Sequence, residues 1–109
     1  MPKGYLLSAH RRPADPEKRA AYLKLAGPAI LKAGGKILAS TSNVKAYENG
    51  KAEQTVLIEF ESFEKAILAY ESDDYQKALD ALDGGADRDF RLFEGAWFYT
   101  NLNHYFFNK

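Results

Sequence analysis

The sequence contains no cysteine among its 109 residues. This absence excludes disulfide bonds, thiolate catalysis and cysteine metal sites together, and it leaves the redox compartment undetermined. The chain also lacks an excess of one charge, because 15 basic and 15 acidic side chains give a formal net charge of zero. A neutral chain offers no electrostatic argument for binding nucleic acid or an anionic membrane surface.

Long apolar segments are missing as well. No apolar run approaches the roughly 20 residues that a membrane helix needs, and the first five residues lack the apolar stretch of a signal peptide. The two histidines, His10 and His104, are far apart and lack ligand-like spacing, and no glycine-rich phosphate loop is present. We therefore expect a cytoplasmic protein with no metal, no cofactor, no nucleic-acid partner and no membrane partner.

The composition that remains is that of one globular domain. Hydrophobic residues make up 46% of the chain and charged residues 28%, and a chain of this size buries about two thirds of its unfolded surface. We expect residues 1–96 to form the domain and residues 97–109 to be an aromatic extension. Such an extension needs a cover, so it is expected to pack on a partner subunit, cap the end of a barrel or form a lid over a ligand.

Apolar periodicity and turn signals predict the order strand, helix, strand, strand, helix, strand. The predicted strands cover residues 5–10, 36–40, 53–60 and 88–94, with an extension of the second at 44–47 and a hairpin turn at Asn49 and Gly50. The first predicted helix covers residues 16–33, and the second is divided into 62–70 and 73–82. A capping Asp or Ser stands at the start of each segment, and glycine pairs follow residues 33 and 82.

The first predicted helix has two further features. Its expected buried stripe consists of Ala20, Leu23, Ala26, Ile30 and Leu31. Pro28 lies inside the helix, where it removes a backbone donor, so we expect the helix to be kinked or split there.

This order of elements predicts a ferredoxin-like βαββαβ protomer of the α+β class, with a four-stranded antiparallel sheet in the order 4-1-3-2. The first and third strands are expected to be parallel central neighbours, and both helices to cover one face. On the third strand, Val56, Ile58 and Phe60 should meet the helices. Leu57 should point to the opposite face, as should Leu6 on the first strand. A second copy of the chain is the simplest cover for that face, so we expect a homodimer.

Motifs spread over most of the chain resemble one family. In chain order they are Lys3-Gly4-Tyr5, Ala9-His10, Gly34-Gly35-Lys36, Ile58-Glu59-Phe60-x-Ser62-Phe63-Glu64-x-Ala66, Tyr70-x-Ser72-x-x-Tyr75-Gln76-x-Ala78, Ala86-Asp87-Arg88-Asp89 and Glu94-Gly95. The family is the small bacterial group known as domain of unknown function 1330, in the dimeric α+β barrel superfamily. The resemblance covers roughly residues 3–95 and implies a barrel made by two protomers. Glu61 departs from it, because the family usually has proline there, and the chain continues past the usual end.

The wider superfamily includes cofactor-independent monooxygenases, haem-degrading enzymes, lactone isomerases and ligand-binding modules. The resemblance therefore implies two candidate functions, and it leaves open whether the protein is an enzyme. One is a dimer that binds a small molecule without catalysis. The other is a cofactor-independent oxygenase or isomerase that acts on a small aromatic or carbonyl compound. The lack of a complete catalytic set in the sequence favours the first.

The candidate catalytic residues are His10 and Glu59. If the central strands bring them together with Ser8, the carboxylate would hold the imidazole in one tautomer and raise its basicity, as a general base requires. Alternatively, Glu59 pairs with a cation or faces the partner subunit, and His10 lies at a solvated end of the sheet.

The candidate ligand-binding residues are Ser8, Tyr70, Tyr75, Arg88 and Asp89. Arg88 is suited to clamp a ligand carboxylate, but an ion pair that fixes the preceding loop is the favoured alternative. Tyr22, Tyr70 and Tyr75 are expected mainly to pack in the core or at an interface, and they could also line a pocket between helices and sheet.

Overall fold

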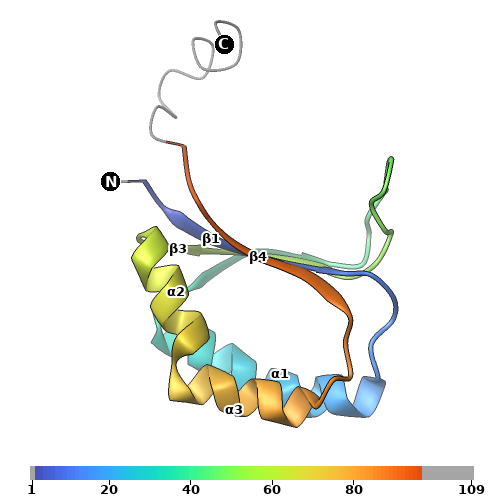
Figure 1. The fold of residues 1–109 in the computed structure, drawn as a ribbon, viewed down its shortest axis with the longest axis horizontal. Helices are drawn as coiled ribbons and strands as arrows, with labels where there is room; N and C mark the ends of the chain where they lie inside the picture. Colours follow the sequence, from blue (N-terminus) through green and yellow to red (C-terminus); the bar gives the residue numbers. More distant parts are fainter. Residues whose placement is uncertain (1, 97–109) are drawn as a thin grey trace, which may run out of the picture.

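In the computed structural model, which describes residues 2–96, a four-stranded sheet lies over three helices (Figure 1). The strands are β1 (Gly4–His10), β2 (Lys36–Thr41), β3 (Thr55–Phe60) and β4 (Arg88–Glu94). The helices are α1 (Pro16–Lys32), α2 (Phe63–Glu71) and α3 (Asp73–Leu82). The expectations for the aromatic extension concern residues 97–109, which lie outside the described residues. No helix of residues 2–96 has the length and apolar character needed to span a membrane.

The strand order is β2-β3-β1-β4, and every neighbouring pair is antiparallel. This confirms the predicted ferredoxin-like fold and the order 4-1-3-2. The prediction that the first and third strands are parallel is wrong, because Gly4 pairs with Phe60 and Ala9 with Thr55. The reason is that β3 folds back antiparallel to β2, while α1 makes β2 parallel to β1, so β3 opposes both of its neighbours.

Side-chain caps set the helix starts where the sequence predicts them. The Asp15 carboxylate accepts hydrogen bonds from the backbone N–H groups of Glu17 and Lys18, both at 3.1 Å. The Ser62 hydroxyl caps α2 by accepting from a backbone N–H at 3.2 Å, and the Ser72 hydroxyl caps α3 in the same way at 3.2 Å. These bonds satisfy donors that the first helical turn leaves unpaired.

Helix α1 is continuous through Pro28, so the predicted split does not occur. Pro28 and Lys24 both lie on the exposed side of the helix. The Lys24 carbonyl, which loses its usual donor to the proline, can therefore bond to water. The helix ends before Gly34, whose φ of 88° is accessible to glycine without strain.

The connection between β2 and β3 differs from the prediction. β2 ends at Thr41, and residues 44–47 form no strand. The positive φ of this turn, 53°, is at Glu48 rather than at Asn49 or Gly50, and the Gly50 N–H donates to the Tyr47 carbonyl at 2.9 Å. The connection rises from the sheet on the side away from the helices (Figure 1).

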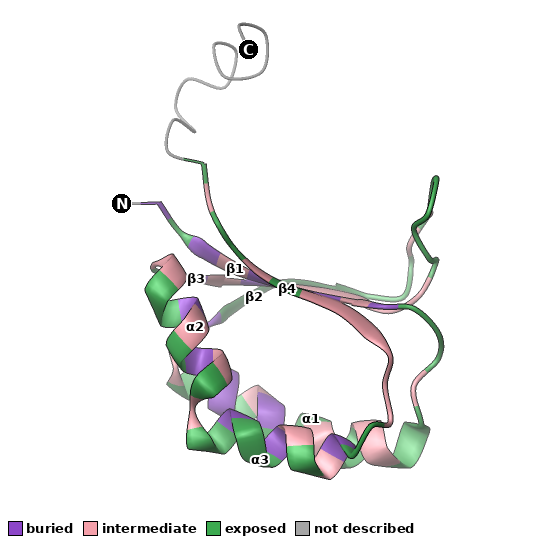
Figure 2. Cartoon of the chain, viewed as in Figure 1, coloured by how far each residue is buried: buried purple, intermediate pink, exposed green. Residues whose placement is uncertain are grey.

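The core lies between the helices and one face of the sheet (Figure 2). Ile58 and Phe60 are buried there, as predicted, and Val56 packs against them. Leu6 is opposite Ile58 in the register and only 2% exposed, so the prediction that it points away from the helices is wrong. Its neighbour Leu7 takes that position instead, opposite Leu57.

Helix α1 buries a narrower stripe than predicted. Ala26 and Ile30 are buried, but Ala20, Leu23 and Leu31 are exposed. The helix packs along α3 rather than flat on the sheet (Figure 1). Its remaining inward residues therefore face the space between helix and sheet.

The face of the sheet opposite the helices is uncovered among the described residues (Figure 2). The ring of Tyr5 stacks on that of Phe93 with centroids 5.5 Å apart, and Leu7 and Leu57 are half-buried beside each other. We call this surface, with Glu59 among its residues, the open face.

Candidate ligand-binding pocket

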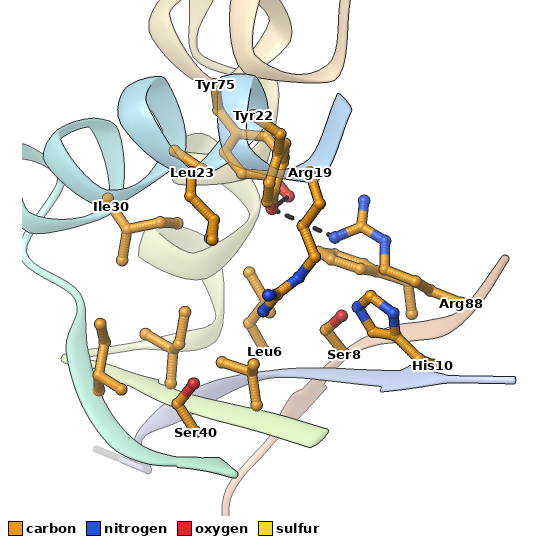
Figure 3. A pocket seen from close by; sticks show the side chains of 16 residues that line it. Leu6, Ser8, His10, Arg19, Tyr22, Leu23, Ile30, Ser40, Tyr75 and Arg88 are labelled. Atoms are coloured by element: carbon orange, nitrogen blue, oxygen red, sulfur yellow. Dashed lines mark hydrogen bonds between the residues drawn. The ribbon is translucent and has the colours of Figure 1, made fainter. Parts of the chain in front are cut away.

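A cavity of about 110 Å³ lies between α1 and the helix-facing side of the sheet (Figure 3). An apolar protein cavity of about 150 Å³ holds one benzene ring, so this smaller cavity can enclose most of a small compound but not a large one. Its apolar walls are formed mainly by Leu6, Leu23, Ile30, Val56, Ile58 and Phe90. Leu23 and Ile37 line it and are 45% and 49% exposed, which places an opening between α1 and β2.

Strand and helix periodicity bring the polar side chains into this cavity. Ser8 and His10 alternate with outward residues on β1 and therefore share the inward side with Leu6. Arg88, at the start of β4, is opposite His10 in the register. Arg19 and Tyr22, three residues apart on α1, point toward the sheet from the helix (Figure 3).

Arg88, Tyr22 and Tyr75 form one polar cluster. The hydroxyl oxygens of the two tyrosines are 2.6 Å apart, and Nη1 of Arg88 donates to the Tyr22 hydroxyl at 3.2 Å. The guanidinium carbon of Arg88 lies 5.1 Å from the ring centre of Tyr22 and 4.8 Å from that of Phe90. Burial, and secondly the neighbouring Tyr22, raise the pKa of Tyr75, so its phenol stays protonated.

His10 is a buried imidazole whose ring has no hydrogen-bonding partner among residues 2–96. Burial lowers the pKa of His10 below its ordinary value of 6.5; the nearby Arg19 and Arg88 lower it further, against an opposing effect of Glu53. The ring is therefore neutral at pH 7 and can accept a proton.

Glu59 does not join this site, and the expected convergence of Ser8, His10 and Glu59 is wrong. Residues opposite each other in an antiparallel pair share a face. Glu59 is opposite Tyr5, whose hydroxyl donates to its carboxylate at 3.3 Å on the open face. Ser8 is opposite Val56 on the other side of the sheet.

Two other candidates lie outside the cavity. Asp89 has its carboxylate 2.9 Å from the guanidinium of Arg91, and that hydrogen bond lowers the pKa of Asp89. Tyr70 packs its ring 5.3 Å from that of Tyr75 and 5.4 Å from that of Phe90, as expected for a packing role. The cavity is lined by the remaining candidates, Ser8, His10, Tyr75 and Arg88.

The expected ion pair near the start of β4 exists, but Arg88 does not form it. Arg12 makes the bond instead, to Asp87 at 2.7 Å. No three His, Asp or Glu side chains in the described part of the chain are placed to hold a metal ion together.

Comparison with known proteins places the chain in a family. Residues 3–96 match the sequence profile described as a domain of unknown function (DUF1330). The chain belongs to this family. The resemblance inferred from the sequence motifs is thereby confirmed. No curated protein matches the chain.

Solved structures share the fold of this DUF1330 protein. A protein of unknown function from Rhodopseudomonas palustris matches with a TM-score of 0.66 and 17% identity, over 87% of this chain and 83% of that one. A candidate antibiotic biosynthesis monooxygenase from Caulobacter crescentus matches with a TM-score of 0.55 and 16% identity, over 87% and 90%. At these identities the likeness shows the fold alone, which is a ferredoxin-like α+β fold with a four-stranded antiparallel sheet.

The cavity of this DUF1330 protein also contains residues that the sequence reasoning missed. Arg19 is absent from the predicted candidates, and Tyr22 is expected mainly to pack, with a place in a pocket lining only as the alternative. Their spacing of three residues, in line with the buried Ala26, was the available signal, because such positions share one side of a helix.

Proposed function

We propose that the protein binds a small organic molecule in the cavity between α1 and the sheet. The observation that carries this proposal is an apolar cavity into which His10 and Arg88 turn. Among residues 2–96, the His10 ring has no hydrogen-bonding partner and Arg88 donates only to the Tyr22 hydroxyl. No side-chain nitrogen or oxygen of the described residues is both fully buried and unpaired, so the polar groups of the lining face open space in the cavity. Protein interiors are normally close-packed, so such open space needs an explanation. An apolar cavity with a few convergent polar groups is typical of a ligand site.

A thermal-shift screen of small organic compounds tests this proposal. Compounds that bind the cavity should raise the melting temperature of the wild type, because they bind only the native state. Leu23→Trp narrows the opening of the cavity with a larger side chain, so it should weaken the binding of these compounds at least about 10-fold. Leu31→Trp is the matched control, because it makes the same change on the same helix at a residue that is 63% exposed and outside the cavity. If both variants weaken the binding of a compound equally, or if neither weakens it, that compound does not bind in the cavity.

A second candidate function is cofactor-independent oxygenation or isomerisation of a small aromatic or carbonyl compound. The observation that favours it is the neutral His10, which has no hydrogen-bonding partner among residues 2–96 and lies beside two guanidinium groups. His10 would accept a proton from the substrate, and Arg19 and Arg88 would stabilise the anion that forms. Glu59 takes no part in this scheme, because it lies on the open face.

This catalytic role predicts a particular pH profile for turnover of a compound found in the screen. His10 must be neutral to accept a proton, so kcat/KM should fall as the pH drops through the pKa of His10 in the free protein. Because that pKa is lowered, the fall should lie below pH 6.5. His10→Gln should bind the compound and lose conversion. Conversion by His10→Gln with the wild-type profile would exclude His10 as the base.

We also propose that the protein is a homodimer in which a second copy covers the open face. The proposal is supported by the Tyr5–Phe93 stack and by Leu7 and Leu57, which form an apolar patch on an uncovered sheet. The cytoplasmic location stays a prediction.

A further inference from the structure

We infer that the ligand of this cavity is an organic anion, a carboxylate attached to a compact apolar or aromatic body. This inference deepens the proposed function and rests on it. Three features of the cavity support it: the charge of its lining, the direction of its hydrogen-bond donors, and the separation of its charged and apolar ends.

The lining of the cavity carries two guanidinium groups and no carboxylate, although the chain as a whole is neutral. The four ion pairs of the described residues use other cations, namely Arg12, Lys18, Lys32 and Arg91. Arg88 is half-buried and has only a phenol oxygen as acceptor among residues 2–96. A desolvated cation without a counter-ion is costly, and a bound carboxylate would remove that cost.

The hydroxyl groups of Tyr22 and Tyr75 add a donor to the cavity. Two hydroxyl protons meet in one hydrogen bond, so one proton needs another acceptor. Either phenol can be the donor of this bond, and both tyrosines line the cavity. The proton of the phenol that accepts is therefore free to turn toward a ligand, while Arg88 also donates to the Tyr22 oxygen. With two arginines that can only donate, the site selects a ligand rich in acceptors.

The Arg88 and His10 side chains and the apolar groups of α1 lie toward opposite ends of the cavity. Figure 3 shows Arg88 and His10 at one end, Leu23 and Ile30 toward the other, and Arg19 reaching down from α1 between them. The planar fork of an arginine matches both oxygens of a carboxylate. The apolar end would take the remainder of the ligand, and the exposed Leu23 at the opening leaves room for a longer substituent.

Isothermal titration with acid and amide pairs tests the inference. The probes are benzoate, phenylacetate and isobutyrate, each compared with its neutral amide, together with inorganic phosphate. We expect at least one carboxylate to bind about 10-fold or more tightly than its amide, since hydrogen bonds to charged groups are the stronger ones. Phosphate alone should bind more weakly, because it does not use the apolar end.

Arg88→Met and Arg91→Met form a matched pair for this test. Both remove one arginine from β4, but Arg91 is exposed and paired with Asp89 on the opposite side of the strand. Arg88→Met should weaken binding of the carboxylate about 10- to 100-fold and leave binding of the amide unchanged. Arg91→Met should change neither affinity. If Arg88→Met does not fold, as judged by its unfolding transition, Arg19→Met provides the same comparison from α1.

The outcomes separate the two levels of the proposal. Amides that bind as well as their acids, with both lost in Leu23→Trp, would overturn the preference for anions and keep the cavity as the binding site. If Arg88→Met and Arg91→Met weaken carboxylate binding equally, the carboxylate is attracted by surface charge in general, and the inference is overturned. No binding by any of the six organic probes would also overturn it. Binding that Leu23→Trp leaves unchanged would overturn the proposed function itself.

Discussion

Replacing Leu57 with glutamate is expected to convert a dimer of this protein into monomers. Leu57 lies on the central strand β3, opposite Leu7, in the middle of the open face. If a second copy covers that face, Leu57→Glu buries an unpaired carboxylate, and the symmetry of a dimer does so twice. Each such group costs several kcal/mol, so the dissociation constant should rise more than 100-fold.

Sedimentation velocity measures this directly, because one chain has a mass of 12.2 kDa and a dimer twice that. Leu68→Glu is the matched control: Leu68 is on α2 and 65% exposed, so the same change there should leave the mass unaltered. A wild type that sediments as a monomer at micromolar concentration would contradict the homodimer. Leu57→Glu particles of unchanged mass would show that the dimer uses another surface.

The secondary structure could be predicted because its signals are local. Asp15, Ser62 and Ser72 cap helices within three residues of their own positions, and Gly34 follows the end of α1. At the end of α3 the left-handed position is Asp83, directly before the predicted glycine pair. Such signals depend only on neighbouring residues, so the sequence displays them directly. The order of elements then leads to the ferredoxin-like fold, whose connections leave few alternatives.

The faces of the strands could not be predicted in the same way. Tyr5, Leu6 and Leu7 are all apolar, so alternation alone does not show which of them points to the helices. The assignment depends on the register between β1 and β3, and a shift of one residue exchanges the two faces. The incorrect face for Leu6 and the incorrect pairing of His10 with Glu59 share this cause.

The charged end of the cavity escaped prediction for a related reason. An arginine on a helix that begins at the surface is typical of a solvent-exposed position, and Arg19 shows no local difference. It faces the cavity only because α1 packs along α3 and leaves room above the sheet. Arg88 is a predicted clamp, but its inward direction depends on the register of β4 against β1, which places it opposite His10.

Truncating Tyr75 is expected to be the most destabilising change in the core. Tyr75 is 1% exposed, and its ring packs against those of Tyr22, Tyr70 and Phe90 with centroids 5.3 to 6.5 Å away. Removal of a buried aromatic side chain costs about 3–5 kcal/mol in the free energy of unfolding, of a total of about 5–15. Urea unfolding at a fixed protein concentration should therefore show Tyr75→Ala close to the limit of folding, and a much lower midpoint than wild type.

Two further variants identify which part of Tyr75 is responsible. Tyr47→Ala is the matched control, because Tyr47 is 69% exposed and the same truncation there should cost less than about 0.5 kcal/mol. Tyr75→Phe keeps the ring and removes only the hydroxyl that is hydrogen-bonded to Tyr22, so its cost should be about 1 kcal/mol. If Tyr75→Phe were as unstable as Tyr75→Ala, the hydrogen bond between the Tyr75 and Tyr22 hydroxyls would outweigh ring packing. This bond at the polar end of the cavity would then contribute strongly to holding α1 against α3.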